Sequence, residues 1–209
     1  MCPRAKRQRV DKVGIICEGA NQGGDMQVFR HFAETLLGHQ NIDVVPLGNK
    51  PNLFDKCGTT ARALLDSGCH RVLIVWDLLP SWGAEPATVA ANEAAVRASL
   101  LREDLHRHPC IFLIAIDREL ETWLVADSVA LSAVVPRPPN SVTVRAIRAP
   151  LKEANPKKWL MRKFSDIGRR SYLPERNAVE IARAMPNNLR AVSKIPSFLR
   201  FKDSLAQPC

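Results

Sequence analysis

The stretch Arg71-Val72-Leu73-Ile74-Val75-Trp76-Asp77 is a short apolar run that ends on an acidic residue. Two other runs have a similar form, because 13–17 is followed by Glu18 and 111–116 is followed by Asp117. Short apolar runs separated by amphipathic segments of helix length are typical of buried parallel strands. The carboxyl ends of parallel strands lie at one edge of the sheet, where ligands bind. We therefore expect these acids to gather at one rim, although they are far apart in the chain.

This pattern predicts an α/β, Rossmann-like fold with a mostly parallel central sheet of about four strands flanked by helices. The strands are expected at 11–17, 42–47, 70–76 and 110–116, and the helices of the same region at 25–38, 56–67, 86–107 and 118–127. A loop from Pro80 to Pro86 carries Trp82. Trp123 shares one helix face with Leu120 and Leu124, so we expect it in the core.

A proline-rich break at 136–140 can continue neither helix nor sheet. Shorter helices are expected after it, at 156–166, 174–184, 187–193 and 196–206. We divide the chain into a basic flexible tail (1–10), an α/β domain (11–135) and a basic helical C-terminal segment (136–209) packed on that domain.

The composition, with 46% hydrophobic residues, is sufficient for a real core, and no apolar run approaches the length of a membrane span. The basic N-terminal residues are not followed by an apolar signal-peptide region, so a cytoplasmic protein is expected. The six cysteines show neither a CxxC pair nor zinc-like spacing. We expect them to be structural, without a disulfide framework.

The positive charge is concentrated in the C-terminal third of the chain. Residues 1–139 hold 15 Lys+Arg and 16 Asp+Glu, whereas residues 140–209 hold 15 Lys+Arg and 5 Asp+Glu. Such a basic region indicates a polyanion partner, DNA or RNA, although solvated helix faces are the alternative. The candidate nucleic-acid-binding residues are Lys157, Lys158, Arg162, Lys163, Arg169 and Arg170.

Two of the acids have both a functional and a structural interpretation. Asp77, at the end of a central strand, suits Mg²⁺, which prefers oxygen ligands, but it could instead cap the following loop. Glu18 lies on a tight turn made possible by Gly19, and it could be an ordinary loop acid. The glycines that follow form neither a P-loop nor a dinucleotide-binding motif.

Glu119 and Glu121 cannot both face a site at the rim if 118–127 is helical throughout. Side chains two residues apart on a helix point in different directions. Asp117 is a good N-cap, and acids in a first helical turn are favoured by the helix dipole in any case. Which of the two glutamates points inward stays open.

Several of these residues together resemble bacterial Toprim-like families of uncharacterised function, which are often encoded beside ABC-type or OLD-like ATPases. The resemblance rests on Glu18-Gly19 after the first strand, on Asp77, and on the stretch Glu119-Leu120-Glu121-Thr122-Trp123-Leu124-Val125-Ala126-Asp127. Near the C-terminus, Tyr172, 178–181 and 195–201 are similar to the closing segment of that group. The resemblance covers most of the chain.

The resemblance implies a Toprim-like α/β domain and phosphodiester chemistry that depends on one or two Mg²⁺ or Mn²⁺ ions. Carried over, Glu18 would handle a proton or help to position metal, and Asp77 would be the first carboxylate of a metal-binding Asp-x-Asp pair. Glu121, with Glu119 as the weaker candidate, would complete the cluster. The implied role is a nuclease, the effector of an ATPase-associated phage-defence system.

Two departures from that pattern favour a different function. Position 79, where the second acid of Asp-x-Asp belongs, is Leu79, and the nearest acid in the loop after Glu18 is Asp25. The alternative is therefore a catalytically degenerate Toprim-like module that binds nucleic acid or a protein. A third interpretation, a small-molecule or nucleotide-binding α/β domain, is disfavoured because no phosphate-loop motif is present.

Overall fold

The computed structural model describes residues 12–21, 23–79, 88–136, 141–207 and 209. The expected basic tail, the Pro80–Pro86 loop with Trp82 and most of the 136–140 break therefore lie outside the described residues.

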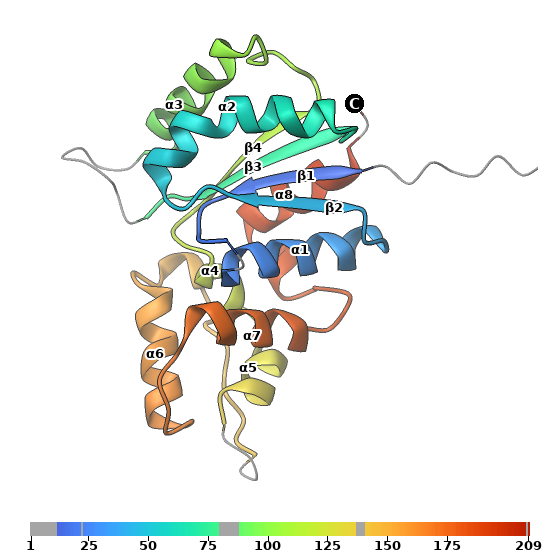
Figure 1. The fold of residues 1–209 in the computed structure, drawn as a ribbon. Helices are drawn as coiled ribbons and strands as arrows, with labels where there is room; N and C mark the ends of the chain where they lie inside the picture. The colour runs from blue at the N-terminus through green and yellow to red at the C-terminus, as the bar shows by residue number, and fades with distance from the viewer. Residues whose placement is uncertain (1–11, 22, 80–87, 137–140, 208) are drawn as a thin grey trace, which may run out of the picture.

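A four-stranded sheet lies at the centre of the molecule (Figure 1). Its strands are β1 (Val13–Cys17), β2 (Ile42–Pro46), β3 (Arg71–Asp77) and β4 (Ile111–Ile116). Their order is β2-β1-β3-β4 and every pair is parallel. The α/β prediction is confirmed, and each strand begins and ends within two residues of its expected position. β1 is buried along its whole length, which is why it forms a continuous apolar run.

Helices cover both faces of the sheet. α1 (Gly24–Leu37) and α8 (Pro196–Ala206) lie on one face, and α2 (Lys50–Asp66) and α3 (Val89–Arg102) lie on the other (Figure 1). The two apolar clusters divide the strands by alternation, since Leu73 packs on the α1 side and Ile74 on the α2 side.

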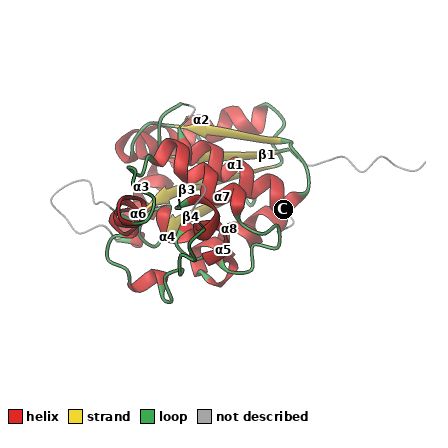
Figure 2. Cartoon of the chain, turned by 90° about the horizontal axis from the view of Figure 1, so that it is seen from below, coloured by secondary structure: helices red, strands yellow, loops and turns green. Residues whose placement is uncertain are grey.

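Smaller helices extend the α1 side of the molecule away from the sheet (Figure 1), and Figure 2 shows these helices from below. They are α4 (Glu121–Leu124), α5 (Ser128–Val134), α6 (Pro156–Asp166) and α7 (Val179–Ala184), with 3-10 turns at Pro150–Lys152 and Val192–Lys194 and a π turn at Pro174–Ala178. One apolar cluster contains residues of both 11–135 and 136–209. The division of the chain into these two segments stays a prediction.

The helix predictions vary in accuracy. Those at 25–38, 156–166 and 196–206 are confirmed almost to the residue. The continuous helix at 118–127 is wrong, because the chain is helical only over α4 and then starts α5, which the sequence did not suggest. The helix at 187–193 is also wrong, since turns precede the short 3-10 segment there.

Trp123 lies in the core, as expected, with no exposed surface. Its ring packs edge-on against Phe29 and Phe198 at centroid distances of 5.9 and 5.0 Å. The indole Nε1 donates a hydrogen bond to Ser197 Oγ at 3.0 Å. This cluster joins α4 to α1 and α8, and so fixes the short helix that carries Glu121.

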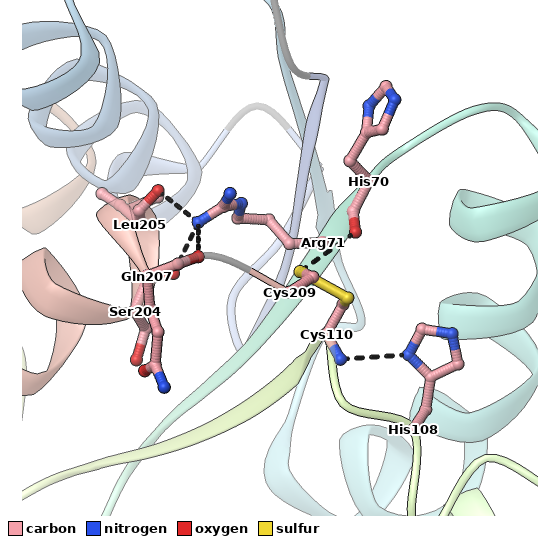
Figure 3. The surroundings of a disulfide bond; sticks show 8 residues. All are labelled: His70, Arg71, His108, Cys110, Ser204, Leu205, Gln207 and Cys209. Atoms are coloured by element: carbon pink, nitrogen blue, oxygen red, sulfur yellow. Dashed lines mark hydrogen bonds between the residues drawn. A yellow bond between two sulfur atoms is a disulfide. The ribbon is translucent and has the colours of Figure 1, made fainter.

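The end of α8 is held against the start of the sheet (Figure 3). Arg71, 7% exposed, donates from Nη1 to the carbonyl oxygens of Ser204, Leu205 and Gln207 at 3.3, 2.7 and 2.6 Å. The last carbonyls of a helix have no partner within the helix, so a cation there is favourable.

A disulfide joins Cys110, just before β4, to Cys209, with 5.2 Å between their Cα atoms. The expectation of cysteines without a disulfide was therefore wrong for this pair. Nothing in the local spacing indicated the bond, because the partners are 99 residues apart and only the fold brings them together. Cys17, Cys57 and Cys69 are free and buried, as expected for structural thiols.

We expect Arg71→Met to lower the free energy of unfolding by about 2 kcal/mol, because hydrogen bonds from a charged group to the α8 carbonyls are lost. Urea denaturation monitored by circular dichroism measures this change. Arg97→Met, at an exposed position on α3, is the matched control and is expected to change little. Equal stability of the two variants would contradict a stabilising role for Arg71.

Candidate functional site

Glu18 and Asp77 meet at the carboxyl edge of the sheet. β1 and β3 are neighbours, but the chain leaves β1 toward β2 on one side and β3 toward β4 on the other. Such a switch in direction opens a crevice at the strand ends, where α/β proteins bind ligands. The backbone N–H of Asp77 donates to Glu18 Oε1 at 3.1 Å, so two acids separated by 59 positions in sequence are in direct contact.

The turn after β1 brings a third acid to the rim. Gly19 has φ of 101°, in the left-handed region, and its N–H and C=O both pair with Gly48 at 3.2 and 2.8 Å. A Cβ at Gly19 would lie 3.0 Å from Asp25 Oδ2, so this carboxylate lies against the turn. Asp25 belongs to the first turn of α1, where the helix dipole favours a negative charge.

These three carboxyls share one perturbed environment. Burial raises the pKa of Asp77 well above its usual range, and the charges of Asp25, Glu18, Glu121 and Glu119 raise it further. Burial raises the pKa of Glu18 to about 7, although the Lys50 charge and the Asp77 N–H oppose the shift. Burial also raises the pKa of Asp25. The rim thus gathers more negative charge than the nearby Lys50 ammonium neutralises.

Glu121 is the fourth member, and α4 turns it toward the rim. It is 6% exposed, and burial raises its pKa to about 7 against the opposing charge of Lys157. Tyr172 donates its hydroxyl to Glu121 Oε1 at 3.3 Å, and Lys157 Nζ lies 3.9 Å from the same oxygen. Of the two glutamates considered, Glu121 is therefore the buried one.

Glu119 has a structural role as well as a place near the cluster. Its Oε1 accepts a hydrogen bond from the backbone N–H of Lys157 at 2.6 Å, in the first turn of α6. Its charge also raises the pKa of both Asp77 and Glu121. Because α4 begins only at Glu121, the helical spacing that seemed to separate the two side chains does not apply.

Asp117 does not cap the following helix, which corrects that expectation. The N-cap position of α4 is Leu120, without a side-chain cap. Asp127 is the acid that caps a helix here, since its Oδ1 accepts from the N–H groups of Val129 and Ala130, both at 2.9 Å. Asp117 Oδ2 is buried and has no hydrogen-bond partner among the described residues.

Lys50 is a site residue that the sequence interpretation missed. It is 2% exposed, and its Nζ donates to the carbonyl oxygen of Leu78 at 3.1 Å, beside Asp77. Burial lowers its pKa, while the charges of Glu18 and Asp77 raise it. Two signals could have found it: Lys50 follows β2, which ends at the same rim, and a cation in a first helical turn opposes the dipole.

A cavity of about 590 Å³ lies beside the acids. Its lining includes Glu119, Arg118, Lys157 and Lys158, and also Leu79. Position 79 thus reaches the space next to the cluster, so the acid that the resemblance expects there would have lain close to the others. Lys157 and Lys158, two of the predicted nucleic-acid-binding residues, line the same space.

The remaining predicted cations lie further along the basic segment. Arg162 and Arg169 are exposed. Lys163 Nζ lies 5.4 Å from the centroid of the Trp159 ring. Arg170 donates to the carbonyl oxygen of Val134 at 2.6 Å and stacks on Phe164, so its guanidinium already has structural partners.

The donor chemistry of the rim suits a hard cation, since Glu18, Asp77 and Glu121 all offer carboxylate oxygens. Their present side-chain positions are not a finished ligand set, because no three Asp, Glu, His or Cys side chains in the described ranges are grouped closely enough to hold a metal ion. A cation would therefore have to draw the carboxylates together, and its positive charge would offset the mutual repulsion that opposes this movement.

Comparison with models of protein families, with curated proteins and with solved structures found no match for this chain. Within the part of the chain that the structure describes, no helix has both the length and the apolar character needed to cross a membrane. The site therefore has to be interpreted from its own residues.

We expect the free energy of unfolding to fall between about pH 5 and pH 8. Glu18 and Glu121 have folded-state pKa values of about 7, above the ordinary 4.5, so the folded state holds their protons more tightly. Their contribution is complete below pH 4.5 and is lost as the pH rises through 7. Urea titrations should show a shallower decline for Glu18→Gln and Glu121→Gln.

The matched control for this measurement is Asp66→Asn, which removes an exposed acid at the end of α2. It should keep the wild-type pH dependence. If both glutamine variants also keep the wild-type pH dependence, Glu18 and Glu121 do not have raised pKa values in the folded protein.

Proposed function

We propose that the protein is a metal-dependent nuclease that hydrolyses phosphodiester bonds of DNA or RNA at this rim. The observation that carries the proposal is the convergence of Glu18, Asp77 and Glu121, with Asp25, on one buried edge of a parallel sheet, where their charges oppose one another. Side chains so placed destabilise the fold at neutral pH, and such perturbed groups cluster at functional sites.

In this proposal Glu18, Asp77 and Glu121 hold Mg²⁺ or Mn²⁺. The ion supplies Lewis-acid stabilisation of the charge that develops on the phosphate oxygens. One or two ions are compatible with the number of carboxylates, and their count stays a prediction. Asp25 adds negative charge, and Glu119 holds the start of α6, which carries the neighbouring lysines.

Glu18 is the residue best suited to move a proton. In the metal-free protein its pKa of about 7 lies near neutral pH, so this carboxyl can both accept and return a proton when it is not ligating the ion. Its Oε1 is oriented by the Asp77 N–H. The carboxylate would take a proton from the attacking water, and the Lys50 ammonium nearby favours its ionised form.

A catalytically degenerate module that binds nucleic acid or a protein is the second candidate. Leu79 favours it, because an apolar side chain lines the cavity where the Toprim-like pattern expects an acid. The ATPase partner, the phage-defence role and the cytoplasmic location implied at the sequence level stay predictions.

The decisive experiment incubates purified protein with plasmid DNA and with RNA, in Mg²⁺ or Mn²⁺, alone and with any ATPase encoded beside it. We expect cleavage that falls about 100-fold or more in Glu18→Gln and in Asp77→Asn, as for loss of an acid–base or metal-binding group. Asp66→Asn should cleave like the wild type. Cleavage that survives both rim substitutions would show that the activity resides elsewhere.

Binding without cleavage under every condition would favour the degenerate module. In that case Leu79→Asp is informative, because it places a carboxylate at the cavity that Glu119 and Lys157 line. A site with a larger number of carboxylate ligands binds a divalent cation more tightly. Isothermal titration with Mn²⁺ should then show higher affinity in Leu79→Asp than in the wild type.

A cation effect on stability tests the metal site without any substrate. Binding to the folded state alone raises the melting temperature by mass action. Because only ionised carboxylates bind Mg²⁺, we expect a larger increase at about pH 8 than at about pH 5. Glu121→Gln should reduce the increase, and Asp66→Asn should not. An increase that is independent of pH, or equal in Glu121→Gln, would argue against the rim as the binding site.

A further inference from the structure

A second cavity, larger than the one beside the acids, lies in the basic C-terminal segment. It is a groove of about 1000 Å³ between the stretch 143–152 and the turn around Val192–Lys194, with Ala126 and Ser128 also in its lining. None of the cations that line it was among the predicted nucleic-acid-binding residues.

Four cations line this groove: Arg145, Arg148, Lys152 and Lys194. All four are exposed, and none of the four side chains has a hydrogen-bond or ion-pair partner among the described residues. Among the described residues, the lining contains no acidic side chain. Some cations elsewhere in the same segment are paired, as Arg176 is in its ion pair with Glu180 at 2.9 Å. An uncompensated group of like charges around a concave surface attracts an anion.

The rest of the lining is largely apolar, including Ile147, Leu151 and Ile195. A single nucleic-acid strand matches both features, because it offers phosphates to the cations and unpaired bases to the apolar surface. A duplex keeps its bases inside and would leave that surface uncovered. No aromatic ring of the described residues lines the groove, so recognition there depends on the backbone and is not specific for sequence.

The groove is connected to the acidic rim through Arg118, the second residue after β4. Its Nε donates to the carbonyl oxygen of Leu151 at 3.3 Å, and its Nη1 to that of Ala154 at 3.5 Å. Leu151 lines the groove, whereas Ala154 and Arg118 itself line the cavity beside Glu119. Residues 150–152 line the groove and Ala154 lines the cavity, so the two spaces lie next to each other along this segment.

We infer that the groove lined by Arg145, Arg148, Lys152 and Lys194 binds a single strand of DNA or RNA by its phosphates and leads it toward the acidic rim. That the bound strand is a substrate rests on the proposed function, whereas its binding in the groove does not. An acidic peptide is the other polyanion that could fit, and the test below separates it.

The test uses the full chain in EDTA, so that metal-dependent cleavage cannot occur. Fluorescence anisotropy with labelled oligo-dT and oligo-rU of about 12 nucleotides, a length within known single-strand site sizes, measures affinity as a function of salt. The groove variant replaces all four cations by Gln. The control variant makes the same change at Lys56, Arg97, Arg107 and Lys202, which are exposed and lie outside the groove lining.

The groove variant should bind at least about tenfold more weakly at moderate salt, and its log–log salt slope should be about three units shallower, because each phosphate contact in a single strand contributes about 0.7. The control variant, with the same net charge, should resemble the wild type. Circular dichroism melting checks that both variants are folded. A preference for oligo-dT or oligo-rU identifies the strand as DNA or RNA.

Equal affinity and slope in the groove and control variants would overturn the proposal, as would a duplex that binds as tightly and with the same dependence on the four cations. Polyglutamate that binds through these cations while oligonucleotides do not would replace the strand with a protein partner. Groove binding without cleavage under any condition would leave this inference intact and remove the proposed nuclease. Cleavage unaffected by the groove variant would leave the nuclease intact and would show that the groove does not lead the substrate to the rim.

Discussion

Carboxylates in a confined space repel one another, and the architecture of this molecule brings several of them to the same edge. The parallel pairing of β1 with β3 fixes where the first two acids lie, because the strand that ends at Cys17 places Glu18 beside Asp77. Burial then makes each ionised form costly, and the neighbouring charges add to that cost. Lys50 and Lys157 offset only part of it. A fold selected for stability alone would replace these acids with neutral residues.

The sheet and the meeting of the acids could be predicted because they depend on local signals. An apolar run of five to seven residues indicates a buried strand, and a parallel sheet places all such endings together. Glu18 and Asp77 needed no further information. The inward position of Glu121 could not be predicted, since it depends on where α4 begins, and that is set by the packing of Trp123 against Phe29 and Phe198.

Other features depend on where a helix begins or on contacts between distant segments. Lys50 reaches the rim because α2 starts six residues earlier than its amphipathic pattern indicates, with Asn49 accepting from the Asn52 N–H as the cap. Glu119 stabilises the start of α6 through a backbone contact 38 residues away. The bond between Cys110 and Cys209 likewise depends on α8 returning along the sheet. Tertiary packing decided the outcome for Glu119 and for the disulfide, whereas the cap at Asn49 was a local signal that the sequence interpretation missed.

The four residues of α4 face two environments at once, with Glu121 toward the charged rim and Trp123 among buried aromatic rings. The orientation of the Glu121 carboxylate therefore depends on how Trp123 packs in the apolar core. Substitution of Phe198 or Phe29 by a smaller residue would let α4 rotate and would change the pKa values of the rim carboxyls, although neither ring carries a titratable atom. A change in the charge of the rim carboxylates would in turn move α4 and alter the fluorescence of Trp123, so this tryptophan is an intrinsic reporter of the site.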